Sequence, residues 1–354
     1  MLRPLNQPPP ADPAAREVRV FVRVRDEVVR MPYFLTHYRS LGVDRFLVAD
    51  NGSTDGTTAL LAAQPDVHLF AADGSYREAR GGQAWLDWLL DEYGAGRWCL
   101  VLDADELLVY PQVEAVPLRS VCDALDREGA AGLPCMLLDM YGAGPIGAAD
   151  YVAGQPFLSA CPWFDGAPYW QTGSDSCPYH EIYGGVRQRI FYSRWQEPDL
   201  KLRISERLYN LGHRFPSIRG NARIQSWRTK RPPNLAKVPL VRWRHGLRYL
   251  ASTHKISPVR LSAGSGLLLH FKFLGDFRSK VVREAGRGEY FDGASEYRRY
   301  ASVLDCAPEL SLWHPASVRL EDSQQLCALG LMTASPQFSS PVARSVRHER
   351  AVHA

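Results

Sequence analysis

The chain has 354 residues, of which 45% are hydrophobic and 23% are charged, and its formal net charge is +4. These values are ordinary for a soluble globular protein with one large or two modest domains, and so small a charge does not by itself indicate a nucleic-acid partner. No run of 18 apolar residues occurs, and the seven cysteines form no Cys-x-x-Cys pair. We therefore expect no membrane-spanning helix, no nucleic-acid binding and a reducing, cytoplasmic location.

The first 140 residues are predicted to alternate strands and helices. Residues 1–16 are rich in proline and alanine, lack the apolar core of a signal peptide, and are predicted to form a disordered tail. Hydrophobic spacing then predicts strands over 18–25, 45–49, 67–70 and 98–102, with helices over 32–42, 57–63 and 83–93 between them. This alternation predicts an α/β fold with a mostly parallel central sheet and helices on both faces.

The pattern changes after about residue 138, where glycine, proline and aromatic residues become frequent. Strands are predicted over 186–192, 238–243 and 267–273, helices over 274–285 and 295–304, and a basic, loop-rich segment over 196–236. Residues 335–354 are predicted to be a flexible tail. We therefore divide the domain into a first half, 17–140, and a second half, 141–330, which contains a smaller mixed subregion.

A cluster of carboxylates follows the strand predicted over 98–102. The run Asp103-Ala104-Asp105-Glu106, called the acidic turn below, lies where open α/β sheets place their ligands. Its carboxylates would repel one another unless a positive charge lay between them, and oxygen ligands suit Mg²⁺ or Mn²⁺. The pattern predicts a divalent-metal site; the alternative is an acidic strand end that caps the next segment.

Two motifs together resemble those of family 2 glycosyltransferases. Residues 50–57 (DNGSTDGT) follow a predicted strand, and the acidic turn comes about fifty residues later. Residues 25–27 and 37–43 resemble the bacterial branch related to family 92, as do three later runs, 184–187, 237–243 and 268–273. The resemblance covers roughly residues 18–330 and implies the GT-A fold, with a nucleotide-sugar-binding first half and an acceptor-binding second half.

The resemblance also implies roles for individual residues. It assigns nucleotide binding to Arg25, Glu27, Asp50, Arg80 and Asp103, and metal binding to Asp103, Asp105 and His270. A carboxylate at Asp50 can accept a hydrogen bond from the imide N–H of uracil, which favours a UDP-linked donor. The alternatives are a helix-capping role for Asp50, a surface position for Arg80, and a core position for His270.

The catalytic base is less clearly marked in the sequence. Family 2 enzymes supply an Asp or Glu after the metal strand, but their usual Glu-Asp pair is missing here. The candidates are Glu181, which we favour, and Asp175, Asp165 and His180. Aromatic residues of the same interval are predicted either to stack on acceptor sugars or to belong to the core: Trp163, Tyr169, Trp170 and Tyr179.

These observations predict a metal-dependent glycosyltransferase that uses a nucleotide sugar and a saccharide or lipid-linked glycan acceptor, in cell-surface polysaccharide biosynthesis. Residues 187–260 contain 18 Lys or Arg and three acids, which suits acceptor phosphates or the inner membrane surface. One alternative is a sugar nucleotidyltransferase, although residues 23–27 lack the glycine-rich loop that such enzymes carry. Another is a non-catalytic polyanion-binding protein.

Overall fold

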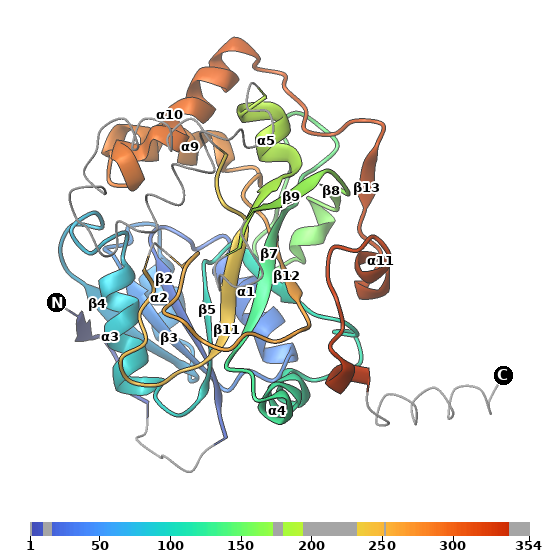
Figure 1. The fold of residues 1–354 in the computed structure, drawn as a ribbon. Helices are drawn as coiled ribbons and strands as arrows, with labels where there is room; N and C mark the ends of the chain where they lie inside the picture. Colours follow the sequence, from blue (N-terminus) through green and yellow to red (C-terminus); the bar gives the residue numbers. More distant parts are fainter. Residues whose placement is uncertain (1, 10–15, 173–179, 194–231, 251–252, 340–354) are drawn as a thin grey trace, which may run out of the picture.

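The computed structural model describes residues 2–9, 16–172, 180–193, 232–250 and 253–339 (Figure 1). A nine-stranded sheet with the strand order β1-β4-β3-β2-β5-β11-β7-β12-β6 forms its centre. The strands are β1 (Leu2–Pro4), β2 (Val18–Val24), β3 (Arg45–Asp50), β4 (Val67–Ala72), β5 (Trp98–Leu102), β6 (Glu106–Val109), β7 (Gly132–Asp139), β11 (Ala236–Arg242) and β12 (Gly266–His270).

Strands β2, β3, β4, β5, β7 and β12 all point in the same direction. Parallel pairing joins β4 to β3, β3 to β2, β2 to β5, and β7 to β12. Strand β11 runs in the opposite direction between β5 and β7, and β1 and β6 are antiparallel edge strands. The predicted fold class, an α/β domain with a mostly parallel central sheet, is confirmed.

Helices cover both faces of this sheet. They are α1 (Met31–Ser40), α2 (Thr57–Ala62), α3 (Gln83–Tyr93), α4 (Leu118–Glu128), α5 (Gly185–Phe191), α9 (Phe277–Arg287), α10 (Phe291–Cys306) and α11 (Ser323–Ala328). Alternate residues of a strand point to opposite faces, so Val20 and Val22 pack with α1 and α4, whereas Phe21 packs with α3. Two short sheets lie beside the main one: β8 (Trp163–Asp165) with β13 (Ser317–Arg319), and β9 (Tyr169–Thr172) with β10 (Glu181–Gly184).

Three predictions about local structure need correction. Within the tail predicted as disordered, Leu2–Pro4 form β1, because they pair with the edge of β4 that would otherwise be open. The strand predicted over 186–192 is wrong, since Gly185–Phe191 form α5, whose residues Val186 and Phe191 are buried. In the tail predicted over 335–354, Pro336–Ser339 form a 3₁₀ turn, and residues 340–354 lie outside the described residues.

Helices α9 and α10 lie over the carboxyl ends of the parallel strands, in the upper part of Figure 1. Two ion pairs fasten α9 there. Arg30 donates to both oxygens of Asp276, at 2.7 and 2.6 Å, and Lys280 donates to Glu27 at 2.8 Å. None of the helices in the described part of the chain combines the length and hydropathy needed to cross a bilayer.

Candidate functional site

A polar cleft opens where β2, β3 and β5 end, beneath α9 and α10. Its empty volume is about 810 Å³, including the part that is open to solvent. The lining includes Arg23, Arg25, Glu27, Asn51, Tyr76, Asp103, Asp105, His270, Lys272, Lys280, Glu284, Arg287, Tyr290 and Tyr297. A crevice at the carboxyl ends of parallel strands is the usual place for a ligand in an open α/β sheet.

Two carboxylates of the acidic turn share one buried cation. Lys237 donates to Asp103 Oδ2 at 2.9 Å and also donates to Glu106 Oε1. The side chains of Lys237 and Glu106 are each 1% exposed, whereas that of Asp103 is 32% exposed and also pairs with Arg23 at 3.1 Å. Asp103, Glu106 and Lys237 are called the floor triad below; Asp103 lines the cleft, and its two partners are buried behind it.

The reversed direction of β11 explains how Lys237 reaches this place. Because β11 runs against β5, its amino-terminal end lies at the edge where β5 ends. The register of β11 against β7 also shifts between Lys237 and Leu240, and such bulges can re-aim a side chain. The positive charge that the acidic turn requires therefore comes in part from the protein itself.

Asp105 faces the cleft and lies beside His270. The distance from His270 Nε2 to Asp105 Oδ2 is 3.6 Å. Strand β12 carries His270 to this edge by pairing with β6 and β7, and the backbone N–H of Phe271 donates to the carbonyl of Asp105 at 2.8 Å. Asp105 and His270 are called the cleft pair below.

The donor atoms of the cleft pair fit a divalent cation. Ligand atoms of Asp105, Glu106 and His270 lie within 4.8 Å of one another. Glu106 already accepts from Lys237, so the donors that face the cleft are an Asp105 oxygen and His270 Nε2. Carboxylate oxygen and imidazole nitrogen together suit Mn²⁺, and Mg²⁺ is compatible with the oxygen ligands.

The charges around the acidic turn shift its pKa values in opposite directions. Burial alone would raise the pKa of Asp105, but the positive charge of His270 holds this pKa well below its usual value. Burial lowers the pKa of His270, whereas Asp105 and Asp139 raise it, and the net shift is upward. For Glu106, burial raises the pKa to about 7, although Lys237 opposes the shift. Asp105 is therefore ionised at neutral pH, as a metal ligand must be.

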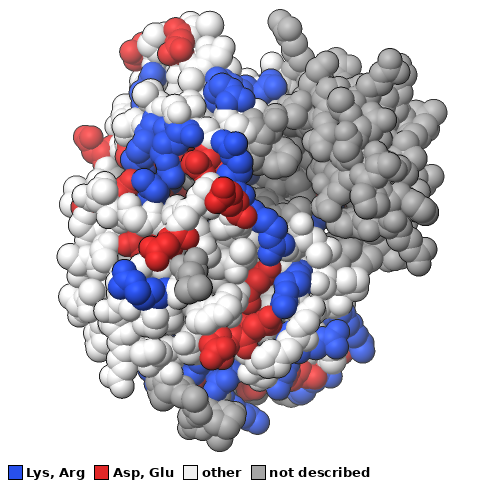
Figure 2. All heavy atoms as spheres, turned by 90° about the vertical axis from the view of Figure 1, so that its left-hand side faces the viewer, with Lys and Arg blue, Asp and Glu red and all other residues white. Residues whose placement is uncertain are grey.

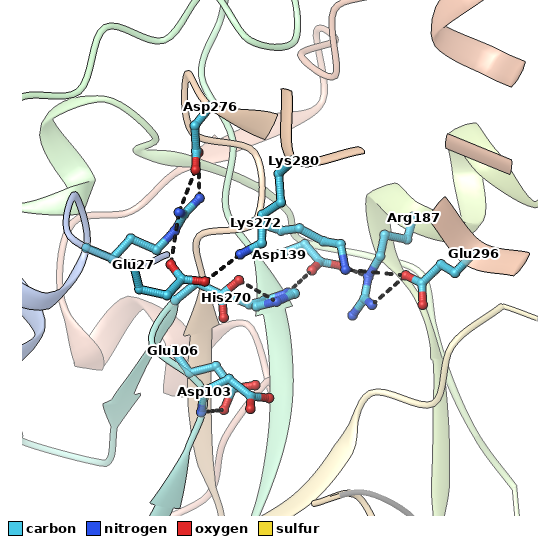
Figure 3. A network of polar contacts seen from close by, with 12 residues as sticks. Glu27, Asp103, Glu106, Asp139, Arg187, His270, Lys272, Asp276, Lys280 and Glu296 are labelled. Carbon is cyan, nitrogen blue, oxygen red and sulfur yellow. Dashed lines mark hydrogen bonds and ion pairs between the residues drawn. The ribbon is translucent and has the colours of Figure 1, made fainter. Parts of the chain in front are cut away.

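A chain of buried ionic contacts continues behind His270 (Figure 3). His270 Nδ1 lies 2.6 Å from Asp139 Oδ1, and Arg187 Nε donates to Asp139 Oδ2 at 2.7 Å. Arg187 also lies 3.6 Å from Glu296 on α10, and Lys272 lies 3.5 Å from the same carboxylate. These contacts connect β12, β7, α5 and α10 around the site.

Positive side chains are frequent in the lining of the cleft. In the described part of the chain, five Lys or Arg and four Asp or Glu line the cleft. A second hollow adjoins it over the ends of β3 and β4, and Arg25, Asn51 and Arg287 line both. An added divalent cation would leave a clear positive excess, which suits an anionic ligand.

The structure brings together five of the residues predicted from the sequence. Arg25, Glu27, Asp103, Asp105 and His270 all line the cleft.

Asp50 and Arg80, by contrast, are absent from the lining. Asp50 Oδ1 accepts from the backbone N–H of Ser53 at 2.9 Å, and Oδ2 accepts from the Thr58 hydroxyl. The Asp50 carboxylate is thus engaged by its own turn and by Thr58, and it does not cap α2, whose N-cap residue is Gly56.

Arg80 donates to Asp87 at 2.8 Å, and its side chain is 56% exposed. The second glycine after it makes room for a neighbouring side chain. Gly82 has a φ of +74°, and a Cβ at this position would lie 2.6 Å from Cδ of Arg23. The missing side chain leaves room for Arg23, which reaches Asp103.

The candidates for the catalytic base that the structure describes do not line the cleft. Asp165 pairs with Arg189 through both oxygens, at 2.9 and 3.0 Å, and Glu181 accepts from Lys255 at 2.5 Å. Neither Asp165, Glu181 nor His180 lines the cleft, and Asp175 lies outside the described residues.

Of the aromatic residues predicted for the acceptor, Trp163 packs beside a buried cluster and the Tyr169 hydroxyl donates to the carbonyl of Asp165. Trp170 lies in β9, and Tyr179 is outside the described residues. None of the three described ones lines the cleft.

Several site residues were not assigned a role from the sequence. Lys237, Arg187 and Lys272 lie within or next to runs that carry the family resemblance, and that proximity was the available signal. Asp139 ends the apolar run of β7, in the same way that Asp103 follows β5, so strand-end position could have indicated it. Lys280 and Tyr297 lie on amphipathic helices and carry no local signal.

Figure 2 shows lysine and arginine side chains gathered in the upper part of one face, at the level of α9 and α10, with acidic side chains between them. Most of the basic segment 187–260 lies outside the described residues, which omit 194–231 and 251–252. Its contact with acceptor phosphates or a membrane surface stays a prediction.

Comparison with known proteins gives no family. No protein-family model and no curated protein matches the chain. Among solved structures, one assigned as a glucose-1-phosphate thymidylyltransferase from Bacillus anthracis has 9% identity and a TM-score of 0.26, over 39% of this chain and 62% of that chain. A 4-diphosphocytidyl-2C-methyl-D-erythritol synthase has 18% identity and a TM-score of 0.24, over 42% and 68%. Likenesses this distant carry no argument about function.

Proposed function

We propose that the chain is a metal-dependent glycosyltransferase that transfers a sugar from a nucleotide donor, UDP-linked, to a saccharide or lipid-linked glycan. The observation that supports it best is the cleft pair. Asp105 and His270 come from the ends of two strands, lie 3.6 Å apart and line a cleft whose lining also includes five Lys or Arg residues. The resemblance of residues 50–57 and of the acidic turn to family 2 glycosyltransferases points to the same chemistry.

Asp105 and His270 are the residues that would hold Mn²⁺ or Mg²⁺. When bound there, the cation supplies Lewis-acid stabilisation of the negative charge on the departing diphosphate.

The other lining residues fit the rest of a nucleotide sugar. Arg25, Lys280 and Arg287 line the same cleft, and their N–H groups can bind diphosphate oxygens. The Asp103 carboxylate is 32% exposed and is held in place by Arg23 and Lys237, so it can accept a hydrogen bond from a ribose hydroxyl. Tyr76 and Tyr297 offer aromatic faces for a ring of the ligand.

The proposal is tested by turnover of a panel of nucleotide sugars with and without Mn²⁺. A thermal-shift screen with Mn²⁺ first identifies the donor, since the nucleotide that binds most tightly raises the melting temperature most. We expect sugar transfer or slow donor hydrolysis that requires Mn²⁺, and Asp105→Ala to lower kcat by about 100-fold or more. Full activity in Asp105→Ala would overturn the proposal.

The same samples separate the two alternatives. A sugar nucleotidyltransferase would release pyrophosphate from a nucleoside triphosphate and a sugar 1-phosphate. A polyanion-binding protein would bind without metal and lose affinity steeply with salt. Either result, in the absence of glycosyl transfer, would replace the proposed activity.

A further inference from the structure

A buried aspartate lies directly behind His270, on the side away from the cleft. Asp139 is the last residue of β7, and the parallel register of β7 and β12 places it opposite His270. Its Oδ1 lies 2.6 Å from His270 Nδ1, and its side chain is only 3% exposed. On the far side of the same ring, Nε2 lies 3.6 Å from Asp105 Oδ2.

We infer that Asp139 is a positioning residue for His270, and that it fixes the ring so that Nε2 is presented to the cleft. This role rests on the proposed function only where Mn²⁺ binding is concerned. A carboxylate can only accept at this contact, so Nδ1 carries the proton and donates it. The lone pair of the neutral ring is then on Nε2, which faces Asp105.

Arg187 gives Asp139 a fixed orientation. Arg187 Nε donates to Asp139 Oδ2 at 2.7 Å, while the other oxygen serves His270. Because each oxygen has its own partner, rotation of the carboxylate would break one contact or the other. The Arg187 side chain is 5% exposed, so this pair is shielded from water and from salt.

The chain offers a matched control for a purely structural role. Asp165 is also 3% exposed and also pairs with an arginine, Arg189 at 2.9 Å. It does not line the cleft. A buried aspartate–arginine pair is costly to break wherever it lies, so loss of stability alone does not distinguish the two sites.

The test uses the full chain and two measurements. The first is the ¹⁵N spectrum of histidine-labelled protein without metal, in which the shifts of His270 report which ring nitrogen carries the proton. At a pH high enough to make the ring neutral, we expect an Nδ1–H tautomer in the wild type and its loss in Asp139→Ala. His270→Gln assigns the signal.

The second measurement is Mn²⁺ affinity, from the electron paramagnetic resonance signal of free Mn²⁺. We expect Asp139→Ala to weaken Mn²⁺ binding by about 10- to 100-fold and Asp165→Ala to leave it unchanged. Equal losses in Asp139→Ala and Asp165→Ala, or an unchanged His270 tautomer in Asp139→Ala, would overturn the inference. If the wild type binds no Mn²⁺ but the tautomer depends on Asp139, the positioning role stands and the proposed metal chemistry fails.

Discussion

The floor triad and the cleft pair come from the same four-residue turn but have different surroundings. Asp103 and Glu106 share the ammonium group of Lys237, which is 1% exposed. Asp105 lies between them in the sequence, faces the cleft, and has His270 at 3.6 Å as its nearby cation. Two carboxylates of the turn are thus neutralised from within the protein, and the third is left for a ligand.

This comparison indicates that Asp103 and Glu106 contribute mainly to stability, whereas Asp105 contributes mainly to function. A buried charge must keep its partner, since removal of one member leaves the other uncompensated. The negative charge of a carboxylate at the edge of a cleft can instead be compensated by a bound ion or substrate. The predictions below test this division, beginning with the largest expected effect on stability.

Lys237→Met is expected to destabilise the protein most. The substitution leaves Asp103 and Glu106 without their shared cation, and breaking a buried pair costs about 3–5 kcal/mol. The measurement is the free energy of unfolding in urea. Arg242→Met, on the same strand, is the control, because its pair with Asp126 is exposed and is worth about 0.2–1 kcal/mol. Equal losses in the two variants would contradict the floor triad.

Acid is expected to remove the stabilisation that ionised Asp139, the partner of His270, gives to the folded protein. Burial raises the pKa of Asp139, but Arg187 and His270 outweigh it and lower the pKa to about 2, from an ordinary 3.8. Because the folded-state pKa is the lower one, the unfolded chain takes up the proton first. The stabilisation, about 2 kcal/mol, is complete above about pH 4 and is lost as the pH falls toward 2.

The measurement for this prediction is the free energy of unfolding of wild type and Asp139→Asn between pH 6 and pH 2. The difference between them should shrink as the pH falls through this window. A difference that stays constant would show that Asp139 does not titrate with a lowered pKa.

Asp105→Asn is expected to separate function from stability. Asn has nearly the same shape, and Asp105 has no partner as close as those of the floor triad, so the free energy of unfolding should fall by less than in Lys237→Met, although the favourable interaction with His270 is lost. The same variant should lose the rise in melting temperature that Mn²⁺ gives the wild type. A loss as large as that of Lys237→Met would show that Asp105 belongs to the floor rather than to the cleft.

Arg80→Ala is expected to have the smallest effect. Its pair with Asp87 is exposed and lies off the cleft, so nucleotide affinity should change by less than about twofold. Arg25→Ala, which removes a cation from the cleft lining, should weaken nucleotide binding by about tenfold or more. Calorimetric titration of the donor identified in the screen measures both variants. Comparable losses would restore the nucleotide-binding role that the family resemblance implies for Arg80.

The sequence identified the strand-end acids because a strand and the turn after it are local features. The apolar run Trp98–Leu102 and the acids after it lie together in the chain, and β5 has the predicted bounds. The strand predicted over 186–192 is wrong because the few apolar residues of so short a segment fit either period. Two glycines before it, with φ of +135° and +65°, turn the chain into α5 instead.

The cation of the floor triad could not be predicted in this way. Lys237 reaches Glu106 across 131 residues and Asp103 across 134 residues of chain. Only the pairing of β11 with β5 brings them together, and no local pattern specifies which strands become neighbours. The sequence therefore indicated that a positive charge was needed, and the three-dimensional arrangement shows which residue supplies it.

Strand β11 is synthesised long after the acidic turn, and this order has a consequence for folding on the ribosome. At about 5–20 residues per second, Lys237 emerges on the order of ten seconds after Glu106. Until then the nascent chain carries the acidic turn without its ammonium partner, and β5 lacks the neighbour that separates it from β7. The first 140 residues are thus not a self-sufficient folding unit, and a fragment that ends there should be aggregation-prone when expressed alone.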